Sequence, residues 1–363
     1  MRSWTDPLHA LQWMEEHIRQ APAEHRWIGY LSYDLGGLFE DLPAIALDDL
    51  GLPLFEFGLV AGGTGVPPVR GAQHGRDALA TGIRSTFSRE SYLAAVSRAI
   101  EYIGAGDIFQ VNLSQRFTAS SHEPPHLIYE RLLETAPAWY GGMLDFGDHA
   151  LVCNSPELFL RIEPNHSTGE RQIITRPIKG TRPRKAGMEA ELRDSIKDQA
   201  ELNMIVDLER NDLGRVCRMG SVNVPEPRVI ESHPTVFHGA ATIEGVLRND
   251  VGFVDLLRAV FPGGSITGAP KIRAMQIIEE LEPVRRGPYC GAIGYLAADG
   301  SMEFNVAIRT MIFREGLVHV PVGGGIVADS DPAAEYDETL VKAQAMFAAL
   351  GLSLPDERGR IPP

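Results

Sequence analysis

YCGAIGYLAADGSMEFNVAIRTMIFREGLVHVPVGGGIVA, residues 289–328, contains three strand-like segments in succession, at 289–298, 303–314 and 317–328. The segments are rich in β-branched and aromatic residues, and short polar or glycine-containing stretches separate them, as is typical of strands. Across the chain, strands and helices arrive in blocks rather than in strict alternation. Such blocks favour an α+β fold with largely antiparallel sheets over a doubly wound parallel sheet.

The same patterns predict the elements on either side of this block. Further strands are expected at 108–118, 150–162, 171–178 and within 215–246. Helices are expected at 88–105, 187–208, 251–260, 270–282 and 332–350. Ser88 and Asp6 are candidate N-caps, the latter for a helix that begins with Pro7. Residues 62–77 are rich in Gly and Pro and are expected to form a loop or linker.

The composition excludes several classes of protein. With 363 residues, 44% of them hydrophobic, the chain is long enough for two lobes or one large α/β unit. Its net charge of −14 argues against a nucleic-acid binder, which would carry a basic surface. The three cysteines lack CxxC spacing and indicate buried thiols in a reducing compartment. No apolar run approaches ~20 residues and no signal-peptide core begins the chain, so we expect a cytoplasmic protein without a membrane span.

A lysine on a constrained turn is the strongest local signal of chemistry. In PIKGT, residues 177–181, Lys179 follows a Pro-Ile pair and precedes a glycine, residues that together fix an unusual backbone. A lysine desolvated at such a place can lose its proton and become a nucleophile. The alternative is a surface lysine at a strand-to-loop corner, which is the commoner role of this residue type.

Four acidic residues form two pairs with helical spacing. The pairs are Asp198 with Glu201 on one predicted helix, and Glu335 with Glu338 on another. A spacing of three residues puts both side chains of a pair on one helical face, and two such faces could hold a hard divalent cation through oxygen ligands. Alternatively, the acids are ordinary exposed residues, and the second pair simply favours the helix macrodipole.

Three further residues fit catalytic or binding roles. Glu157 ends a strand-like segment, where apolar neighbours can raise the pKa of a carboxyl enough for a general acid. His238 lies on an apolar strand, and Arg309, on the predicted strand at 303–314, is a candidate clamp for a carboxylate. The alternatives are an acidic turn residue for Glu157 and a core histidine for His238.

Several longer motifs follow one another along residues 88–350. They are GDIFQVNLS (106–114), SPEL (155–158), PIKGTR (177–182), ELNMIVDLERNDLGR (201–215), FPGGSITGAPKIRAM (261–275), YCGAIGY (289–295) and GGGIVADSDP (323–332). On these motifs the chain resembles the chorismate-utilising enzymes, most closely the large component of the aminodeoxychorismate-forming branch. The resemblance implies an α+β fold of two packed lobes, with antiparallel β-sheets inside and helices outside. It also implies three parts: a segment at 1–87 that completes the sheet, a chorismate-binding catalytic core at 88–350, and a tail at 351–363.

The resemblance assigns roles by position. For Mg²⁺ binding it implies Asp198, Glu201, Glu335 and Glu338; Asp198 stands where many relatives have the longer Glu. For binding chorismate it implies Gly180 and Thr181 at the ring carboxylate, Tyr289, Arg309 and Gly325 at the enolpyruvyl carboxylate, and Ser265 at the ring. For catalysis it implies Lys179, Glu157 and His238, with Glu157 as the general acid that helps the C4 hydroxyl leave and His238 beside the ring.

Two positions distinguish reactions within the family. Lys179 stands where anthranilate-forming relatives have Ala, and the resemblance implies that it attacks C2 of chorismate before ammonia enters at C4. Gln110 stands where isochorismate- and salicylate-forming relatives have the lysine that activates water, and a glutamine cannot abstract a proton. The implied product is therefore 4-amino-4-deoxychorismate, a precursor of p-aminobenzoate and folate.

The ammonia needs a source, and the chain shows no G-x-C-x-G nucleophile segment of a glutaminase. The resemblance therefore implies a separate glutamine amidotransferase partner. Two alternatives remain: an anthranilate synthase large component, and a non-catalytic subunit that binds chorismate or the glutaminase. Lys179 argues against the first, and the presence of both an acid and a nucleophile argues against the second.

Overall fold

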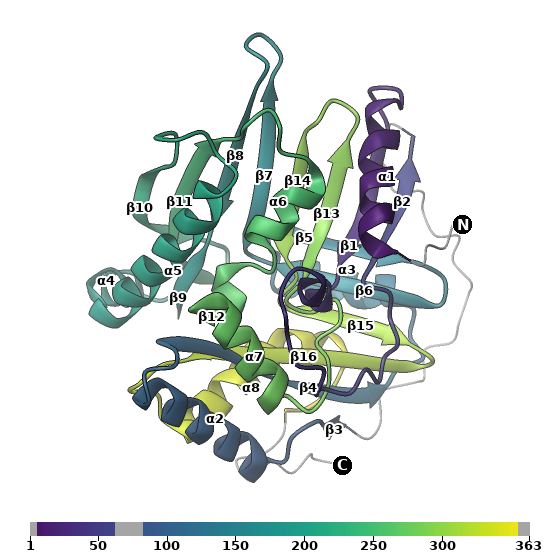
Figure 1. Cartoon of the computed structure of the whole chain (residues 1–363). Helices are drawn as coiled ribbons and strands as arrows, with labels where there is room; N and C mark the ends of the chain where they lie inside the picture. The colour runs from purple at the N-terminus through teal and green to yellow at the C-terminus, as the bar shows by residue number, and fades with distance from the viewer. Residues whose placement is uncertain (1–5, 62–82, 355–363) are drawn as a thin grey trace.

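Two antiparallel sheets form the interior of the molecule. The computed structural model describes residues 6–61 and 83–354. Within this part, one sheet has nine strands and the other has seven, and we call them the large sheet and the small sheet. Neighbouring strands run antiparallel in both. In Figure 1 the large sheet occupies the upper part of the molecule and the small sheet crosses below it. The α+β fold class predicted from the sequence is confirmed.

The strands of each sheet come from distant parts of the chain. The large sheet has the order β10 (Asn223–Ser232), β11 (Val236–Val246), β8 (Glu170–Arg176), β7 (Leu158–Asn165), β14 (Met302–Val306), β13 (Ala292–Ala297), β1 (Arg26–Leu31) and β2 (Phe55–Val60), with β9 (Ile178–Pro183) also paired to β11. The small sheet has the order β12 (Gly268–Ala269), β4 (Gln110–Ser120), β16 (Leu317–Ile326), β15 (Thr310–Arg314), β6 (His149–Ser155) and β5 (Tyr140–Asp145), with β3 (Arg84–Ser85) on β4.

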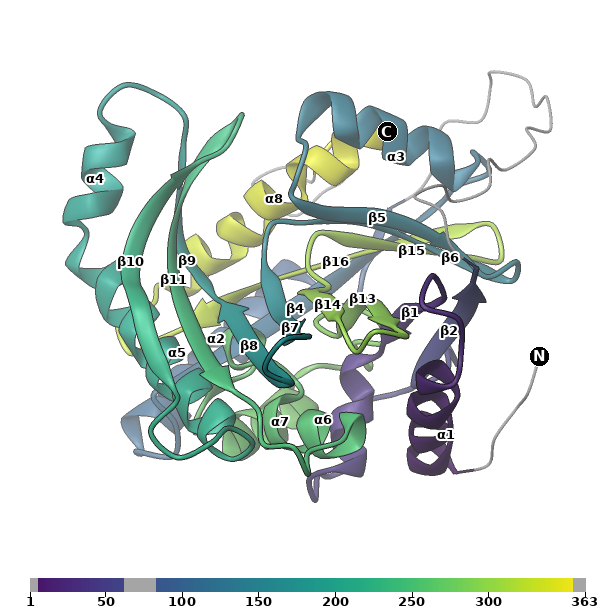
Figure 2. The ribbon, with the colours of Figure 1, turned by 90° about the horizontal axis from the view of Figure 1, so that it is seen from above.

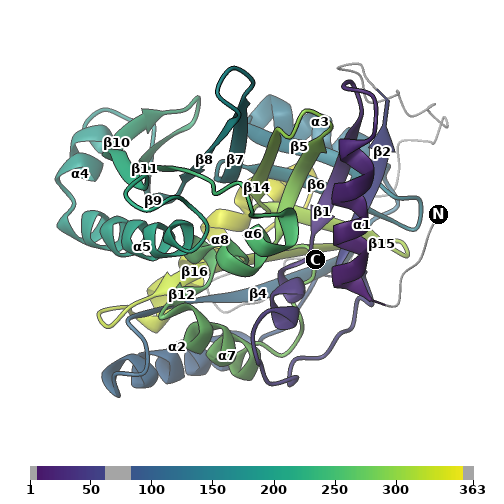
Figure 3. The ribbon, with the colours of Figure 1, turned by 45° about the horizontal axis from the view of Figure 1, so that its top comes forward.

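Helices cover the outer faces of both sheets. They are α1 (Pro7–Arg19), α2 (Arg89–Gly104), α3 (Pro125–Thr135), α4 (Met188–Asp194), α5 (Ile196–Gly214), α6 (Phe253–Val260), α7 (Lys271–Leu281) and α8 (Pro332–Ala349), with short 3-10 turns η1 (Tyr33–Leu38) and η2 (Gly264–Ile266). Helices α2, α3 and α8 lie together along the small sheet, and α4 and α5 lie against β9 and β11 (Figure 2). Helix α1 packs beside α6 on the opposite flank (Figure 3). Among the described helices, none is long and apolar enough to cross a membrane.

The helix starts follow the sequence signals. The side chain of Asp6 accepts hydrogen bonds from the first backbone amides of α1, and Ser88 accepts one from Ser91 at the start of α2, so both predicted caps are confirmed. The helix expected at 187–208 is wrong as a single element, because it breaks at Ser195. The Ser195 hydroxyl accepts from the amide of Asp198 and starts α5 afresh.

Two segments predicted as single strands are each two strands in different sheets. The segment 150–162 divides into β6 of the small sheet and β7 of the large sheet, and 303–314 divides into β14 and β15 in the same way. The prediction that Arg309 lies within a strand is therefore wrong. It lies between β14 and β15 with a φ of 49°, a left-handed conformation that ends strand geometry. The segment 62–77, predicted as a loop, and residues 355–363 of the predicted tail lie outside the described residues.

Candidate active site

Two adjoining crossovers between the sheets place a carboxyl group beside a guanidinium group. Glu157 lies between β6 and β7, and Arg309 lies between β14 and β15. The amide of Val306 donates to the carbonyl of Glu157 over 3.0 Å, and the amide of Asn154 donates to the carbonyl of Arg309 over 3.0 Å. The Ser155 hydroxyl adds a bond of 2.6 Å to the carbonyl of Val306. These bonds fix the two crossovers side by side, and each charged side chain influences the pKa of the other.

The Glu157 carboxyl has the electrostatics of a general acid. Its side chain is buried at 4% exposure. Burial raises its pKa to about 7, and Ser265, Lys179 and Arg309 lower it only in part. A carboxyl with that pKa is substantially protonated at neutral pH, so it can give up a proton and take it back.

Close backbone packing positions Lys179 on β9. Its carbonyl oxygen lies only 2.6 Å from where a Cβ on Gly239 of β11 would stand, so only glycine fits at that position. At the other end of the side chain, Nζ of Lys179 is 3.6 Å from where a Cβ on Gly325 would stand. The amide nitrogen of Gln110 is 3.1 Å from the same place. The ends of the Lys179 and Gln110 side chains therefore both lie next to Gly325, where any residue larger than glycine would crowd them.

The surroundings favour the neutral form of the Lys179 amine. Burial lowers its pKa, and the neighbouring Lys342 adds to this effect, while Glu201, Glu157 and Glu338 oppose it. Within residues 6–61 and 83–354, the Lys179 amine forms no hydrogen bond or ion pair. A desolvated amine without a fixed partner is available to a substrate.

Several buried polar atoms of the predicted site residues have no hydrogen-bond partner among the described residues. They include both amide atoms of Gln110, which is fully buried, together with Oε1 of Glu157 and Oγ of Ser265. Buried polar groups are nearly always paired, because each unpaired group costs about 1–3 kcal/mol. Unpaired buried atoms on three of the residues at or near the predicted site fit a site whose partner is a polar ligand.

The Arg309 guanidinium is also without a protein partner. It is half-buried, and in the described part of the chain no hydrogen bond or ion pair reaches it, although its backbone carbonyl is bonded. A guanidinium presents paired donors that match a carboxylate. Arg309 is therefore suited to hold an anionic group of a ligand near Glu157.

His238 is a neutral residue of the site wall. It lies opposite Thr181 in the pairing of β9 and β11, and its Nδ1 is 2.8 Å from the Thr181 hydroxyl. Burial, together with the charges of Arg309 and His233, lowers the pKa of His238 to about 3. The ring is therefore uncharged at neutral pH, which suits it to orient neighbours or ligand rather than to carry a proton there.

The two acidic pairs lie on α5 and α8 and influence one another. Burial raises the pKa of Glu201, and Asp198 and Glu338 raise it further. Burial also raises the pKa of Glu335, with a contribution from Glu338, although Ser330 donates a hydrogen bond of 2.6 Å to it. Residues of one pair therefore sense the charge of the other, as the predicted meeting of two helical faces requires.

These carboxylates provide the oxygen donors that Mg²⁺ prefers. Glycines approach both pairs: a Cβ on Gly324 would lie 3.4 Å from Glu335, and one on Gly180 would lie 2.8 Å from the Asp198 carboxyl carbon. At present, however, Arg182 holds Asp198 at 3.0 Å and Lys342 holds Glu338 at 2.7 Å. Among the described side chains no group of three or more potential ligands converges on one point. The donor chemistry fits Mg²⁺, provided that these two ion pairs open.

Comparison with known proteins identifies the family. Residues 63–348, more than half of the chain, match the family of chorismate binding enzymes. The chain belongs to this family. Anthranilate synthase component 1 of Thermus thermophilus is 41% identical over 96% of this chain and 83% of its own length. Aminodeoxychorismate synthase component 1 of Salmonella typhimurium is 40% identical over 95% of this chain and 82% of its own. Both kinds of chorismate-utilising enzyme are thus among its relatives.

A solved structure agrees with this assignment. The crystal structure of anthranilate synthase component I from Streptococcus pneumoniae superimposes with a TM-score of 0.81, at 31% sequence identity. The match covers 94% of this chain and 85% of that chain. This chorismate-utilising enzyme therefore shares its fold with a family member along nearly its whole length.

Two predicted binding residues occupy different surroundings in this enzyme. Ser265, on η2, is buried beside Glu157 and lowers the pKa of that carboxyl. Tyr289 is buried near Arg286 and Glu282, and burial raises its pKa. Within the described residues no hydrogen bond connects Tyr289 with Arg309 or Gly325, so the structure does not yet join these three predicted residues into one carboxylate clamp.

Sequence reasoning missed the cations that hold the predicted metal ligands. Lys342 follows Glu338 by four residues on α8 and also donates to the carbonyl of Gly323 over 2.9 Å. Arg182 follows the PIKGT segment directly. Both were detectable, the first from its helical spacing and the second from its place in a basic cluster.

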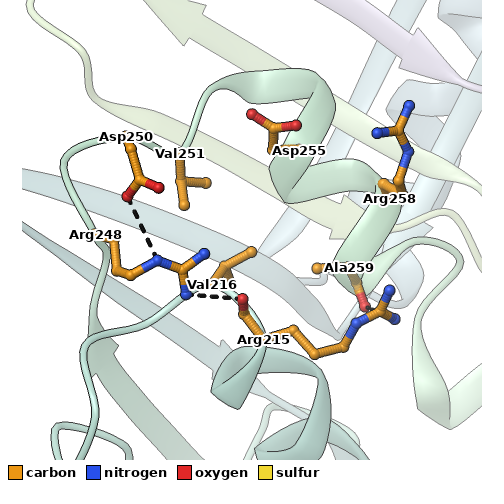
Figure 4. A pocket seen from close by; sticks show the side chains of 8 residues that line it. All are labelled: Arg215, Val216, Arg248, Asp250, Val251, Asp255, Arg258 and Ala259. Carbon is orange, nitrogen blue, oxygen red and sulfur yellow. Dashed lines mark hydrogen bonds and ion pairs between the residues drawn. The ribbon is translucent and has the colours of Figure 1, made fainter.

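A pocket near the end of α5 is not this site. Figure 4 shows it beside α6, where it has a volume of about 300 Å³ and is lined by Arg215, Val216, Arg248, Asp250, Val251, Asp255, Arg258 and Ala259. Arg215 and Arg258 are exposed and Arg248 is half-buried, and Arg215 and Arg248 donate to backbone carbonyls. None of the predicted catalytic or binding residues lines it.

Proposed function

We propose that this enzyme aminates chorismate at C4 to give 4-amino-4-deoxychorismate, a precursor of p-aminobenzoate and folate in the cytoplasm. The observation that carries the proposal is the Lys179 amine, which lies next to Gly325 and Gln110, has a lowered pKa and has no partner among the described residues. An alanine at this position, as the resemblance implies for anthranilate-forming relatives, would leave no nucleophile there.

Lys179 and Glu157 divide the chemistry between them. The lysine nitrogen forms a bond to C2 of chorismate, the ring double bonds shift, and the C4–O bond breaks. Glu157 gives its proton to the departing hydroxyl, which leaves as water. Ammonia then forms the C4–N bond, the double bonds shift back, and the bond between C2 and the lysine breaks. The new C4 ammonium gives one proton back to Glu157, which restores the acid. The pKa of Glu157 near 7 suits a group that must be protonated before the first step.

The remaining residues bind the substrate and the metal ion, and Gln110 does not activate water. Arg309 holds the enolpyruvyl carboxylate, Ser265 and His238 border the ring, and Gln110 contributes hydrogen bonds without activating water. Asp198, Glu201, Glu335 and Glu338 would hold Mg²⁺, which when bound supplies positive charge for the ring carboxylate. Gly180 allows the backbone to approach this region, since its φ is +80° and a side chain there would meet Asp198.

The ammonia would come from a separate glutamine amidotransferase subunit. The relatives named component 1 are consistent with a partner subunit, and free ammonium salts should replace it in vitro. An anthranilate synthase large component is the alternative, and the 41% identity to the Thermus thermophilus enzyme favours it. The two reactions share the substrate and differ in the ring carbon to which ammonia adds. Analysis of the product therefore separates them.

The first test is consumption of chorismate by purified protein. With Mg²⁺ and ammonium ions, the enzyme is expected to consume chorismate, and chelation of the metal is expected to stop it. A non-catalytic binding subunit would consume none under any of these conditions, with or without a glutaminase. That result would contradict the proposal.

Arg309→Lys is expected to raise KM for chorismate about 10- to 100-fold with a smaller effect on kcat. The variant keeps a positive charge and loses the paired donors, and hydrogen bonds to charged groups are worth roughly 1.5–3 kcal/mol. Steady-state kinetics would measure the change. Arg161→Lys is the matched control: it alters a half-buried arginine on β7 that is paired with Glu303 of β14. An unchanged KM in Arg309→Lys would show that Arg309 does not hold the substrate.

A further inference from the structure

A second buried carboxyl lies behind Glu157 and has no part in the reaction described above. Glu209 on α5 is buried at 8% exposure, and its Oε2 accepts a hydrogen bond of 2.7 Å from Thr175 of β8. Its other oxygen has no hydrogen-bond partner in the described part of the chain. Glu209 faces a cavity of about 20 Å³, lined by Phe159, Leu160, Ile173, Thr175, Glu209, Asp212, Leu213, Val260, Gly263 and Gly264. That volume accommodates one water molecule.

Two short paths connect this carboxyl with the general acid. In the first, Glu209 packs against Gly264, where a Cβ would lie 3.4 Å from the Glu209 Cγ, and the next residue, Ser265, adjoins Glu157. In the second, Thr175 is next to Arg176, which is paired with Leu158 across β7 and β8, and Leu158 follows Glu157. Both paths are rigid, because each runs through a buried turn or a paired strand.

We propose that Glu209 is a positioning residue for Glu157: a buried second carboxyl, held by Thr175 against the turn that carries Ser265, whose charge state controls how long the general acid keeps its proton. This inference rests on the proposed function for its catalytic meaning, and on the packing of Glu209 for its physical basis.

The consequence follows from like charge in a buried site. Burial raises the pKa of Glu209 to about 8, and the charges of Glu157 and Asp212 raise it, while Thr175 and Lys271 lower it. Asp212 is itself paired with Lys271 at 2.5 Å, so Glu157 is the unpaired carboxyl that Glu209 senses. Above neutral pH the two carboxyls resist ionising together, so the last proton is held mostly by Glu209 and, in a smaller fraction of molecules, by Glu157.

Glu209→Gln removes this resistance while keeping size and hydrogen-bonding capacity. In assays of chorismate consumption with ammonium, kcat/KM of the variant is expected within about twofold of wild type at pH 6. At pH 9 it is expected to be about three- to tenfold lower, because Glu157 then ionises unopposed and one pKa unit is a factor of ten. Glu244→Gln, a change from carboxyl to amide on β11 outside the site, is the matched control and is expected to leave the profile unchanged.

A second measurement separates this inference from the proposed function. Melting temperatures from pH 5 to pH 9 would be compared for wild type, Glu157→Gln, Glu209→Gln and the double variant. Coupled carboxyls are expected to make the loss of stability with rising pH larger in wild type than the sum of the contributions seen in the single variants. If wild type consumes no chorismate, the proposed function fails, and the melting data still test the coupling. Superimposable or uniformly lowered pH profiles, or additive melting shifts, would overturn the inference.

Discussion

Glu157→Gln is expected to lower kcat for chorismate amination by about 10³-fold, within the range that general acid catalysis contributes. The amide keeps the shape of the side chain and cannot donate a proton to the departing C4 hydroxyl. KM should change little, because in this account the substrate carboxylates are bound by Arg309 and by the Mg²⁺ that the acids on α5 and α8 would hold. Single-turnover and steady-state kinetics at saturating ammonium would measure the loss. A variant that retained more than a tenth of the wild-type kcat would contradict the role of Glu157.

The fold of this variant can be checked by its stability. Burial raises the pKa of Glu157 from 4.5 in the unfolded chain to about 7 in the folded protein. Its contribution to stability is therefore fully present below about pH 4.5 and is lost as the pH rises through 7. Glu157→Gln has no such loss, so its melting temperature at pH 8 should equal or exceed that of wild type. Glu163→Gln, at an exposed position near the far end of β7, should affect neither measurement.

Lys179→Ala is the second change with a large expected effect, a loss of C4 amination of at least about 10²-fold. Without the amine no bond to C2 can form, and the C4–O bond must break without that assistance. Lys179→Arg should not restore activity, because a guanidinium stays protonated and is not a nucleophile. Chromatography of the reaction mixture would measure 4-amino-4-deoxychorismate directly.

Lys185→Ala is the matched control for that experiment. Lys185 is an exposed lysine in the turn after β9, and its removal should leave the rate unchanged. If Lys179→Ala formed the amino product at the wild-type rate, the lysine would be a wall of the pocket and no nucleophile. Anthranilate from the variant, where wild type makes none, would instead show that this residue selects between the two reactions.

The sequence predicted element types better than it predicted where strands change sheet. The strand-like sequence continues without a break through 150–162 and 303–314, because residues on both sides of each crossover are buried. Nothing in the pattern marks Glu157 or Arg309 as the point of departure except Pro156 and a polar interruption. The adjacency of the two crossovers depends on backbone hydrogen bonds between segments about 150 residues apart, which a single sequence cannot show.

The candidate site, too, could be predicted from the sequence only in part. The motifs identified Glu157 and Lys179, and the resemblance added Arg309 by position. The structure adds that each has a polar group without a hydrogen-bond partner among the described residues. Glu209 escaped notice because it occurs inside a helix as one acid among several, and only the packing of Thr175 and Gly264 around it distinguishes it. Lys342 escaped for a similar reason, since its effect on Lys179 crosses from α8 to β9.

The identity of the product tests the account most directly. Purified wild-type protein would be incubated with chorismate, Mg²⁺ and ammonium ions, and the product identified by mass and ultraviolet spectrum. We expect 4-amino-4-deoxychorismate, with its pyruvyl ether intact. Anthranilate, an aromatic product that has lost pyruvate, would contradict amination at C4 and assign the chain to the other branch of its family.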